Sequence, residues 1–232
     1  MSGRTIVIGG GHNGLVAAAA LAQRGRDVLL LEARDSLGGL AGKRSFGAYA
    51  VPGILHDTRG FRRQVADGLE LGKHGLEFGS GSEPVCAPSV DGGAIWLRPD
   101  AVEGACTDAD KEAFNKLRAF LGRVSPVISD ILNAAAPSPE GSLWPLLKTA
   151  ISVRGLGEAD MIELLRIGPM CIADWMRDSF STERLMAAIA LPSIEAAYAG
   201  PWSGGTVANL LLREAAAGDP VKGGPAAIVD AL

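Results

Sequence analysis

Three glycines in the spacing Gly9-x-Gly11-x-x-Gly14 leave this chain few choices of fold near its start. They follow an apolar, β-branched run at residues 5–8 and precede an alanine-rich segment at residues 13–24, which has high helix propensity. In such a turn the first glycine permits a tight bend, the second lets a pyrophosphate approach the backbone, and the third lets helix and strand pack closely. The pattern therefore predicts a phosphate-binding turn at the start of a helix.

A second apolar run at residues 28–31 ends in Glu32. A strand, a glycine turn, a helix and another strand in this order predict one βαβ unit with a right-handed crossover. The Glu32 carboxylate would then end the second strand, where it accepts hydrogen bonds from an adenosine ribose and repels a 2′-phosphate. These residues predict dinucleotide binding, with NADP disfavoured.

The segment after Glu32 indicates whether the predicted cofactor is FAD or NAD. An NAD domain is expected to continue into another helix and strand here, whereas residues 33–41 continue as a loop that holds a second glycine pair. The small residues Gly38 and Gly39 let the backbone meet the pyrophosphate from the other side. This pattern predicts FAD, with an ordinary surface loop as the alternative. The FAD-binding residues predicted in this region are Gly9, Gly11, His12, Asn13, Gly14, Glu32, Ala33, Arg34, Gly38, Gly39, Leu40 and Ala41, with His12 acting through its backbone.

The remaining sequence is mostly helical in pattern. Two short apolar runs at residues 83–87 and 94–97 flank Asp91-Gly92-Gly93, which predicts a hairpin. Thr107 and Asp110 have the spacing of a capping box and open a helix through residue 121. Further helices are predicted at residues 57–71, 158–167, 170–177, 182–191 and 206–217, with a last helix that starts at Pro225.

Composition and charge exclude other classes of protein. The 232 residues include 22 basic and 26 acidic side chains, for a net charge of −4 and no run of Lys and Arg, so we expect no nucleic-acid partner. Hydrophobic residues make up 47% of the chain, which excludes a disordered protein. Three widely spaced cysteines predict no disulfide framework and a cytoplasmic location. The apolar stretch at residues 15–22 is too short to span a bilayer, so membrane contact is expected to be peripheral at most.

Catalytic motifs are absent from the sequence. It contains no GxSxG, no HExxH and no cluster of metal ligands, so it predicts neither a nucleophile nor a metal site. Methionine and aromatic side chains gather between residues 161 and 202. They would suit a long apolar substrate, but core packing is the favoured interpretation. These side chains are Met161, Met170, Trp175, Met176, Met186, Tyr198 and Trp202.

The glycine turn, the Leu31-Glu32-Ala33-Arg34 segment and the second glycine pair resemble the FAD-binding amino terminus of phytoene-desaturase-like flavin oxidoreductases. The similarity is closest to their pyridine nucleotide-disulfide oxidoreductase domain 2 branch. It covers nearly all of this chain, but only about the first half of a family member. The other segments that carry it are residues 67–78, residues 199–203 with Thr206, and residues 222–225.

The resemblance implies an FAD-dependent oxidoreductase of the desaturase or dehydrogenase type, acting on an apolar or unsaturated small molecule. It also implies that residues 52–56 and 223–226 lie near the isoalloxazine ring. Gly223 and Gly224 therefore join the predicted cofactor-binding residues. His56 becomes the best candidate for substrate contact or proton transfer, although a structural loop histidine is the favoured alternative.

The predicted fold class is α/β: a Rossmann-like FAD-binding βαβ unit with an incomplete parallel sheet, plus part of a mostly helical α+β substrate domain. We expect an FAD-binding segment at residues 1–82, a partial substrate domain at 83–218 and a return segment at 219–232. A doubly wound sheet needs about five or six strands and only two are evident, which favours a split enzyme completed by a second polypeptide over a truncated product. The alternative functions are a non-catalytic nucleotide-binding subunit and, disfavoured, a small NAD-dependent dehydrogenase.

Overall fold

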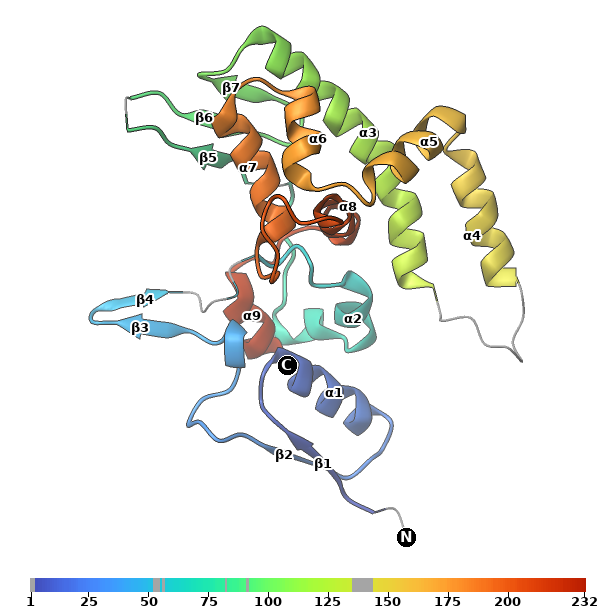
Figure 1. The fold of residues 1–232 in the computed structure, drawn as a ribbon. Coiled ribbons are helices and arrows are strands. Elements are labelled where there is room, and N and C mark those ends of the chain that lie inside the picture. Colours follow the sequence, from blue (N-terminus) through green and yellow to red (C-terminus); the bar gives the residue numbers. More distant parts are fainter. Residues whose placement is uncertain (1–2, 52–54, 56, 82, 91, 135–143) are drawn as a thin grey trace. The chain divides into compact units, whose positions relative to one another are not determined.

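The computed structural model describes residues 3–51, 55, 57–81, 83–90, 92–134 and 144–232 (Figure 1). The chain divides into two compact units. Unit 1 consists of Met1–Gly81 together with Ala217–Leu232, and unit 2 consists of Ser82–Ala216.

Unit 1 begins with the predicted βαβ arrangement. Strands β1 (Thr5–Ile8) and β2 (Val28–Leu31) pair in parallel, with Ile8 opposite Leu31. Helix α1 (His12–Gln23) connects them and packs against both strands. Both strands coincide with the apolar runs of the sequence, and the helix starts one residue earlier than predicted. The α/β fold class with a Rossmann-like start is therefore confirmed.

Short elements follow β2 in place of a second long helix. The 3-10 helix η1 (Gly39–Ala41) leads into an antiparallel hairpin of β3 (Arg44–Phe46) and β4 (Tyr49–Val51). Helix α2 (Arg63–Gly68) and the 3-10 helix η2 (Leu71–His74) come next.

The prediction of a continuous helix over residues 57–71 is wrong. The α-helix covers only Arg63–Gly68, because the backbone before it bonds elsewhere. The Asp57 carboxylate accepts the N–H of Arg59 at 2.9 Å, a local bond that competes with helix formation. The buried Thr58 hydroxyl accepts the N–H of Val221, and the Arg59 carbonyl accepts the N–H of Gly218. Thr58 and Arg59 thus bind the return segment near the end of the chain.

That return segment completes the core of unit 1. Val221 lies beside Phe78 in an isolated antiparallel bridge, and the chain then enters α9 (Gly224–Ala231). Ile228 and Ala231 of α9 are buried. They pack in one cluster with buried side chains from the α2–η2 region, namely Ala66, Leu69, Leu71 and Leu76.

Unit 2 begins with a three-stranded antiparallel sheet of β5 (Val85–Ala87), β6 (Ile95–Leu97) and β7 (Val102–Gly104). The predicted pairing of the first two runs is confirmed, whereas Asp91 of the turn lies outside the described residues. The third strand was not predicted, since three residues ending in glycine carry no alternating pattern.

Helices build the rest of unit 2. Four predicted helices are confirmed, and their first and last residues agree with the prediction to within three residues. They are α5 (Glu158–Ile167), α6 (Ile172–Ser179), α7 (Glu183–Ile194) and α8 (Thr206–Ala216). Helix α4 (Trp144–Gly155) was not predicted.

Helix α3 (Asp108–Asn133) continues well beyond the predicted end at residue 121. Gly122 and Pro126 favour an end there, because glycine lowers helix propensity and proline lacks an N–H. Val124 is fully buried and Ile128 packs against the same core, so tertiary packing overrides the local signals.

The start of α3 is capped as the sequence predicts, because the Thr107 hydroxyl accepts the N–H of Asp110 at 3.1 Å. The Asp110 side chain is 1% exposed and forms a second set of bonds across the unit. It accepts the N–H of Ser181 at 2.7 Å and the hydroxyls of Ser181 and Thr182. Burial by itself raises the pKa of Asp110, but these donors outweigh burial and hold the pKa below its usual range. The carboxylate therefore ties α3 to the residues before α7.

The methionine and aromatic side chains of residues 161–202 divide between core and surface. Trp175 and Met176 are buried in the core of unit 2, and Met170 and Met186 pack against that core. In contrast, Tyr198 is fully exposed, and Trp202 is 56% exposed. Across the described residues, no helix combines the length and the apolar character needed to cross a membrane.

Candidate functional site

The glycine turn between β1 and α1 has the geometry that its spacing predicts. Gly9 has a φ of 104°, a left-handed value that favours glycine, and its N–H donates to the Leu31 carbonyl at 2.7 Å. A Cβ added at Gly14 would lie 2.0 Å from the Gly9 carbonyl oxygen. The third glycine thus allows α1 to start directly against the end of β1.

The amino terminus of α1 offers backbone donors to an anion. Gly11 is the N-cap residue in an extended conformation, and no side chain caps this helix in the described structure. A Cβ added at Gly11 would meet only Gly39 Cα, at 3.9 Å. The missing side chain therefore leaves a space lined by backbone beside the first-turn N–H groups. This cradle fits a pyrophosphate, since phosphates bind where helix N–H groups and the positive end of the helix dipole converge.

Glu32 lies beside the same turn. Its carboxylate oxygens accept the Gly10 N–H at 2.6 Å and the Arg34 N–H at 3.0 Å. The N–H groups of Arg34 and Gly10 lower the pKa of Glu32, so the carboxylate stays ionised at more acidic pH than an ordinary glutamate does. An ionised carboxylate has about four lone-pair positions, and these two bonds leave others for ribose hydroxyls.

The second glycine pair is brought against the first turn. The Gly38 N–H donates to the Gly10 carbonyl at 2.7 Å, and Gly38 pairs with Gly11 in a short parallel bridge. Gly38 and Gly39 have φ values of 110° and 58°. A Cβ at Gly39 would lie 3.0 Å from Gly11 Cα, so the two glycine segments pack backbone against backbone.

Gly223 and Gly224 lie at the amino terminus of α9. Both have positive φ, of 80° and 72°, and Pro225 follows within the first turn. Helix α9 packs against η1 and α1. A Cβ at Gly38 would lie 3.1 Å from Val229 Cγ2, which places α9 next to the second glycine pair.

The other predicted site residues surround this centre. His12 and Asn13 form the first turn of α1, and Ala33 and Arg34 follow the end of β2. Leu40 is 54% exposed. Buried Ala41 ends η1. The catalytic candidate His56 and most of its segment, residues 52–54, lie outside the described residues. Contact of any of these residues with a cofactor stays a prediction.

Sequence reasoning missed the role of Gly10. Its N–H anchors Glu32, and a Cβ there would lie 2.5 Å from Leu37 Cδ2 and 3.2 Å from Glu32 Cβ. The sequence did contain a signal for this role. Gly10 is the middle one of three consecutive glycines, and the Gly-x-Gly-x-x-Gly spacing does not require a glycine there.

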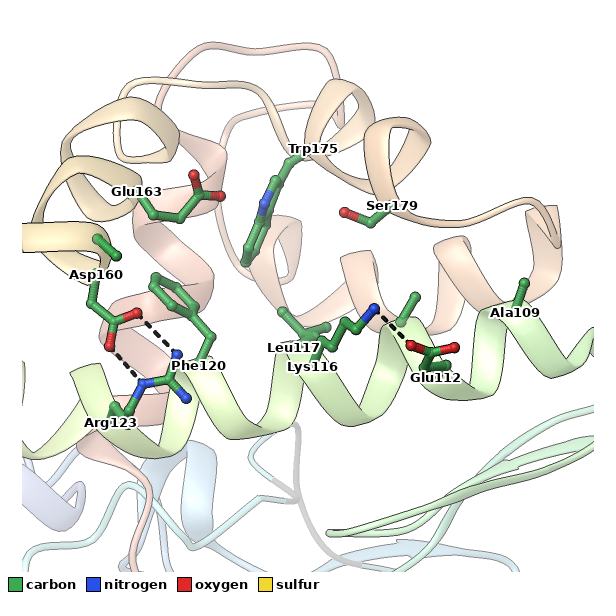
Figure 2. Close-up of a pocket in the computed structure, with 12 residues that line it drawn as sticks. Ala109, Glu112, Lys116, Leu117, Phe120, Arg123, Asp160, Glu163, Trp175 and Ser179 are labelled. Carbon is green, nitrogen blue, oxygen red and sulfur yellow. Dashed lines mark hydrogen bonds and ion pairs between the residues drawn. The ribbon is translucent and has the colours of Figure 1, made fainter.

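Unit 2 contains a separate hollow of about 630 Å3 between α3, α5 and α6 (Figure 2). Phe120 and Trp175 form its apolar wall. Two ion pairs flank this wall, one between Arg123 and Asp160 at 2.5 Å and the other between Glu112 and Lys116 at 2.7 Å. Because these charges neutralise one another, the hollow offers a ligand mainly apolar surface. No group of three or more metal-ligating side chains occurs among the described residues.

A parallel βαβ unit with a glycine cradle and a terminal acid defines a Rossmann-like nucleotide-binding protein. Residues 7–62 match the family described as NAD(P)-binding Rossmann-like domain. The chain is 27% identical to rat pyridine nucleotide-disulfide oxidoreductase domain-containing protein 2, over 98% of this chain and 44% of the rat protein. It is also 27% identical to the phytoene dehydrogenase of Streptomyces griseus, over 84% of this chain and 39% of that protein. The chain is thus related to the NAD(P)/FAD-binding oxidoreductases that include these two proteins.

Solved structures give the same fold. A wild-type putrescine oxidase bound to putrescine matches 98% of this chain with a TM-score of 0.54 and 17% sequence identity. The match covers 48% of the putrescine oxidase chain. This chain therefore spans less than half the length of these two relatives and of the putrescine oxidase, and it shares the fold of that oxidase over the matched part.

Proposed function

We propose that this chain is the FAD-binding half of a phytoene-desaturase-like flavin oxidoreductase, and that a second polypeptide completes the enzyme. The observation that carries the proposal is the backbone cradle at the start of α1, where Gly11 and Gly39 pack together with ionised Glu32 beside them. Such a cradle suits the pyrophosphate and ribose of a dinucleotide.

The course of the chain after β2 supports FAD over NAD. An NAD domain would place a second crossover helix after this strand. Here the chain turns through η1 into the β3–β4 hairpin, and its second glycine pair returns to the first turn through the bond from Gly38 to Gly10. Two glycine-lined segments can then approach one pyrophosphate from opposite sides.

The chain's own groups would bind and orient the cofactor, while bound FAD would supply hydride and electron transfer. The first-turn N–H groups of α1 would hold the pyrophosphate. The free lone pairs of Glu32 would accept the ribose hydroxyls, and its negative charge would repel a 2′-phosphate. Gly223 and Gly224 would border the flavin end of the site, as the resemblance implies.

The proposed substrate is an apolar or unsaturated small molecule. This proposal follows the resemblance of the sequence and the name of the Streptomyces griseus relative, a phytoene dehydrogenase. We place the protein in the cytoplasm, in accord with the free thiols of Cys86, Cys106 and Cys171. His56 is a weak candidate for contact with the substrate or for proton transfer, and a structural loop histidine is the favoured alternative.

The Glu32→Gln variant tests the ribose contact. Glutamine keeps one oxygen for the Gly10 N–H but loses the charge and an acceptor position, so we expect flavin retention to weaken by about tenfold or more. The measurement is the flavin content of the complex purified with its second polypeptide, read from the visible flavin absorbance and from the extracted cofactor. Asp35→Asn, an exposed acid in the same loop, serves as the matched control and should keep the flavin.

Three outcomes would contradict the proposal. Equal flavin content in Glu32→Gln and wild type would show that Glu32 does not hold the ribose. A colourless complex that binds only ADP or NAD would indicate a non-catalytic nucleotide-binding subunit instead. A flavin complex in which no donor bleaches the flavin would contradict the oxidoreductase activity.

A further inference from the structure

The buried hydroxyl of Thr58 is bonded to the return segment. Thr58 is 5% exposed, and its Oγ1 accepts the N–H of Val221 at 2.8 Å. Val221 is itself buried. The residues on either side of it, Pro220 and Lys222, bond to residues 77–79 through backbone groups, at 2.7 and 2.9 Å. Thr58 therefore holds the edge of this short extended segment that faces away from residues 77–79.

The bond supplies the acceptor that the Val221 N–H needs. Along an extended segment the backbone N–H groups of successive residues point to opposite edges, so the Val221 N–H points away from residues 77–79. A buried backbone N–H without an acceptor costs free energy comparable to a lost hydrogen bond. Loss of the Thr58 hydroxyl would therefore move Val221 or leave its N–H unpaired.

Helix α9 starts directly after Val221. The Val221 carbonyl accepts the N–H of Gly224, the first residue of the helix, at 3.1 Å. The helix then lies against the second glycine pair, because a Cβ added at Gly38 would lie 3.1 Å from Val229 Cγ2. That distance is shorter than an ordinary van der Waals contact. The position of Val221 therefore sets how α9 packs against Gly38.

Gly38 connects α9 to the cradle. Its N–H donates to the Gly10 carbonyl at 2.7 Å, and the Gly10 N–H donates to the Glu32 carboxylate at 2.6 Å. The neighbouring Gly39 packs against Gly11, backbone against backbone. A shift of α9 would therefore reach the glycine segments and the carboxylate together. Contiguous packed and hydrogen-bonded groups of this kind can carry coupling between separated residues.

We propose that Thr58 is a positioning residue for nucleotide binding. Its bond to Val221 fixes α9, and α9 holds Gly38 in the geometry in which the cradle and Glu32 bind a diphosphate and its ribose. This inference rests on the proposed function and adds a residue outside the predicted cofactor-binding set.

Unit 2 contains a bond of the same kind, which gives a matched control. Thr206 is 1% exposed, and its Oγ1 accepts the N–H of Ile172 at 2.8 Å. This bond joins the start of α8 to the start of α6. Both helices belong to unit 2, whereas the predicted cofactor-binding residues all belong to unit 1. Thr206→Val therefore removes a bond of the same type and length without acting on the cradle.

The test measures ADP binding to the full chain by titration calorimetry, because ADP carries the diphosphate and the ribose. Thr58→Val keeps the shape of the side chain and removes the acceptor, whereas Thr58→Ser keeps the hydroxyl. The temperature is one at which circular dichroism shows every variant to be folded, so a loss of stability alone leaves the Kd unchanged. We expect Thr58→Val to bind ADP at least about tenfold more weakly, and Thr58→Ser and Thr206→Val to bind within about twofold of wild type.

Val229→Ala tests the connection through α9. It removes the contact with Gly38, so we expect ADP binding to weaken by about fivefold or more. The double variant with Thr58→Val should bind within about twofold of the weaker single variant, because both changes act through the same helix. In wild type, ADP should slow amide exchange in α9, and Thr58→Val should lose this protection.

Equal ADP affinity in wild type and Thr58→Val would overturn this inference and leave the proposed function intact. An equal loss in Thr206→Val would assign the effect to stability, and an equal loss in Thr58→Ser would assign it to packing; either result overturns the role of the hydroxyl. Additive effects of Thr58→Val and Val229→Ala would contradict the connection through α9. A wild-type chain that binds no ADP would contradict the proposed function as well as this inference.

Discussion

Replacing Gly11 with alanine should strongly weaken cofactor binding without disturbing the fold, whereas the same change at Gly14 should damage both. The Cβ of Gly11→Ala would meet only Gly39 Cα, at an ordinary contact distance of 3.9 Å. Gly11 also has an extended backbone that alanine adopts freely. The added methyl group would occupy the space in which the pyrophosphate meets the backbone. We expect cofactor affinity to fall by at least about 100-fold, and stability to change by less than about 0.5 kcal/mol.

Gly14→Ala is the matched comparison. Its Cβ would lie 2.0 Å from the Gly9 carbonyl oxygen, so the turn and α1 must move apart. Overpacking of this kind costs about 3 kcal/mol, and the gain in helix propensity of about 1 kcal/mol offsets only part of it. Hydrogen exchange of the α1 amides measures the stability of unit 1, and flavin content measures binding. Normal flavin content in Gly11→Ala would contradict the assigned cradle, and an unchanged exchange rate in Gly14→Ala would contradict the turn geometry.

Loss of the Asp110 charge should strongly destabilise unit 2. Asparagine has nearly the same shape, but its NH2 group would face donors where the carboxylate now accepts from Ser181 and Thr182. A buried carboxylate that loses several such bonds costs about 3 kcal/mol. Urea unfolding followed by tryptophan fluorescence measures this effect, because all four tryptophans lie in unit 2 and Trp175 is buried.

The pH dependence of the same variant gives an independent check. The pKa of Asp110 is lower in the folded chain than in the unfolded chain, so its stabilising contribution is complete above about pH 5, begins to fall near the unfolded pKa and is lost as the pH falls through the folded pKa. The difference in unfolding free energy between wild type and Asp110→Asn should therefore shrink in acid. Asp108→Asn, an exposed acid of the same helix turn that pairs with Lys111, is the control and should unfold nearly like wild type. Equal unfolding midpoints for wild type and Asp110→Asn would show that the bonds from Asp110 to Ser181 and Thr182 do not stabilise unit 2.

The local signals in the sequence predicted most of the elements. The apolar runs that form β1 and β2 are bounded by glycine or by charged residues, and Thr107 marks the start of α3. These features act over a few residues, so a single sequence reveals them. The division into domains and the partner polypeptide stay predictions.

The errors occurred where distant segments decide the local structure. Residues 57–62 leave the helical pattern because they bind the return segment near Val221, some 160 positions later in the chain. Helix α3 passes Gly122 and Pro126 because its second half is buried. No local pattern records such contacts.

The candidate site shows the same division between local and distant effects. The spacing of Gly9, Gly11 and Gly14 and the position of Glu32 could be predicted, and the structure brings these residues together. The sequence also predicted that the second glycine pair approaches the same site, but it could not predict the bond between Glu32 and Gly10 or the bond from Gly38 to Gly10. Both depend on how the loop after β2 folds back, which glycine permits but does not specify.

The contribution of Ala217–Leu232 to unit 1 has a consequence for synthesis on the ribosome. The βαβ segment is translated first, but Val221, Ile228 and Ala231 fill its core only after all of unit 2 has been made. Contacts separated so widely along the chain form slowly and leave early intermediates exposed. The apolar side chains of the nascent nucleotide segment therefore stay exposed until this last helix has been made, and chaperones would be needed most during that interval.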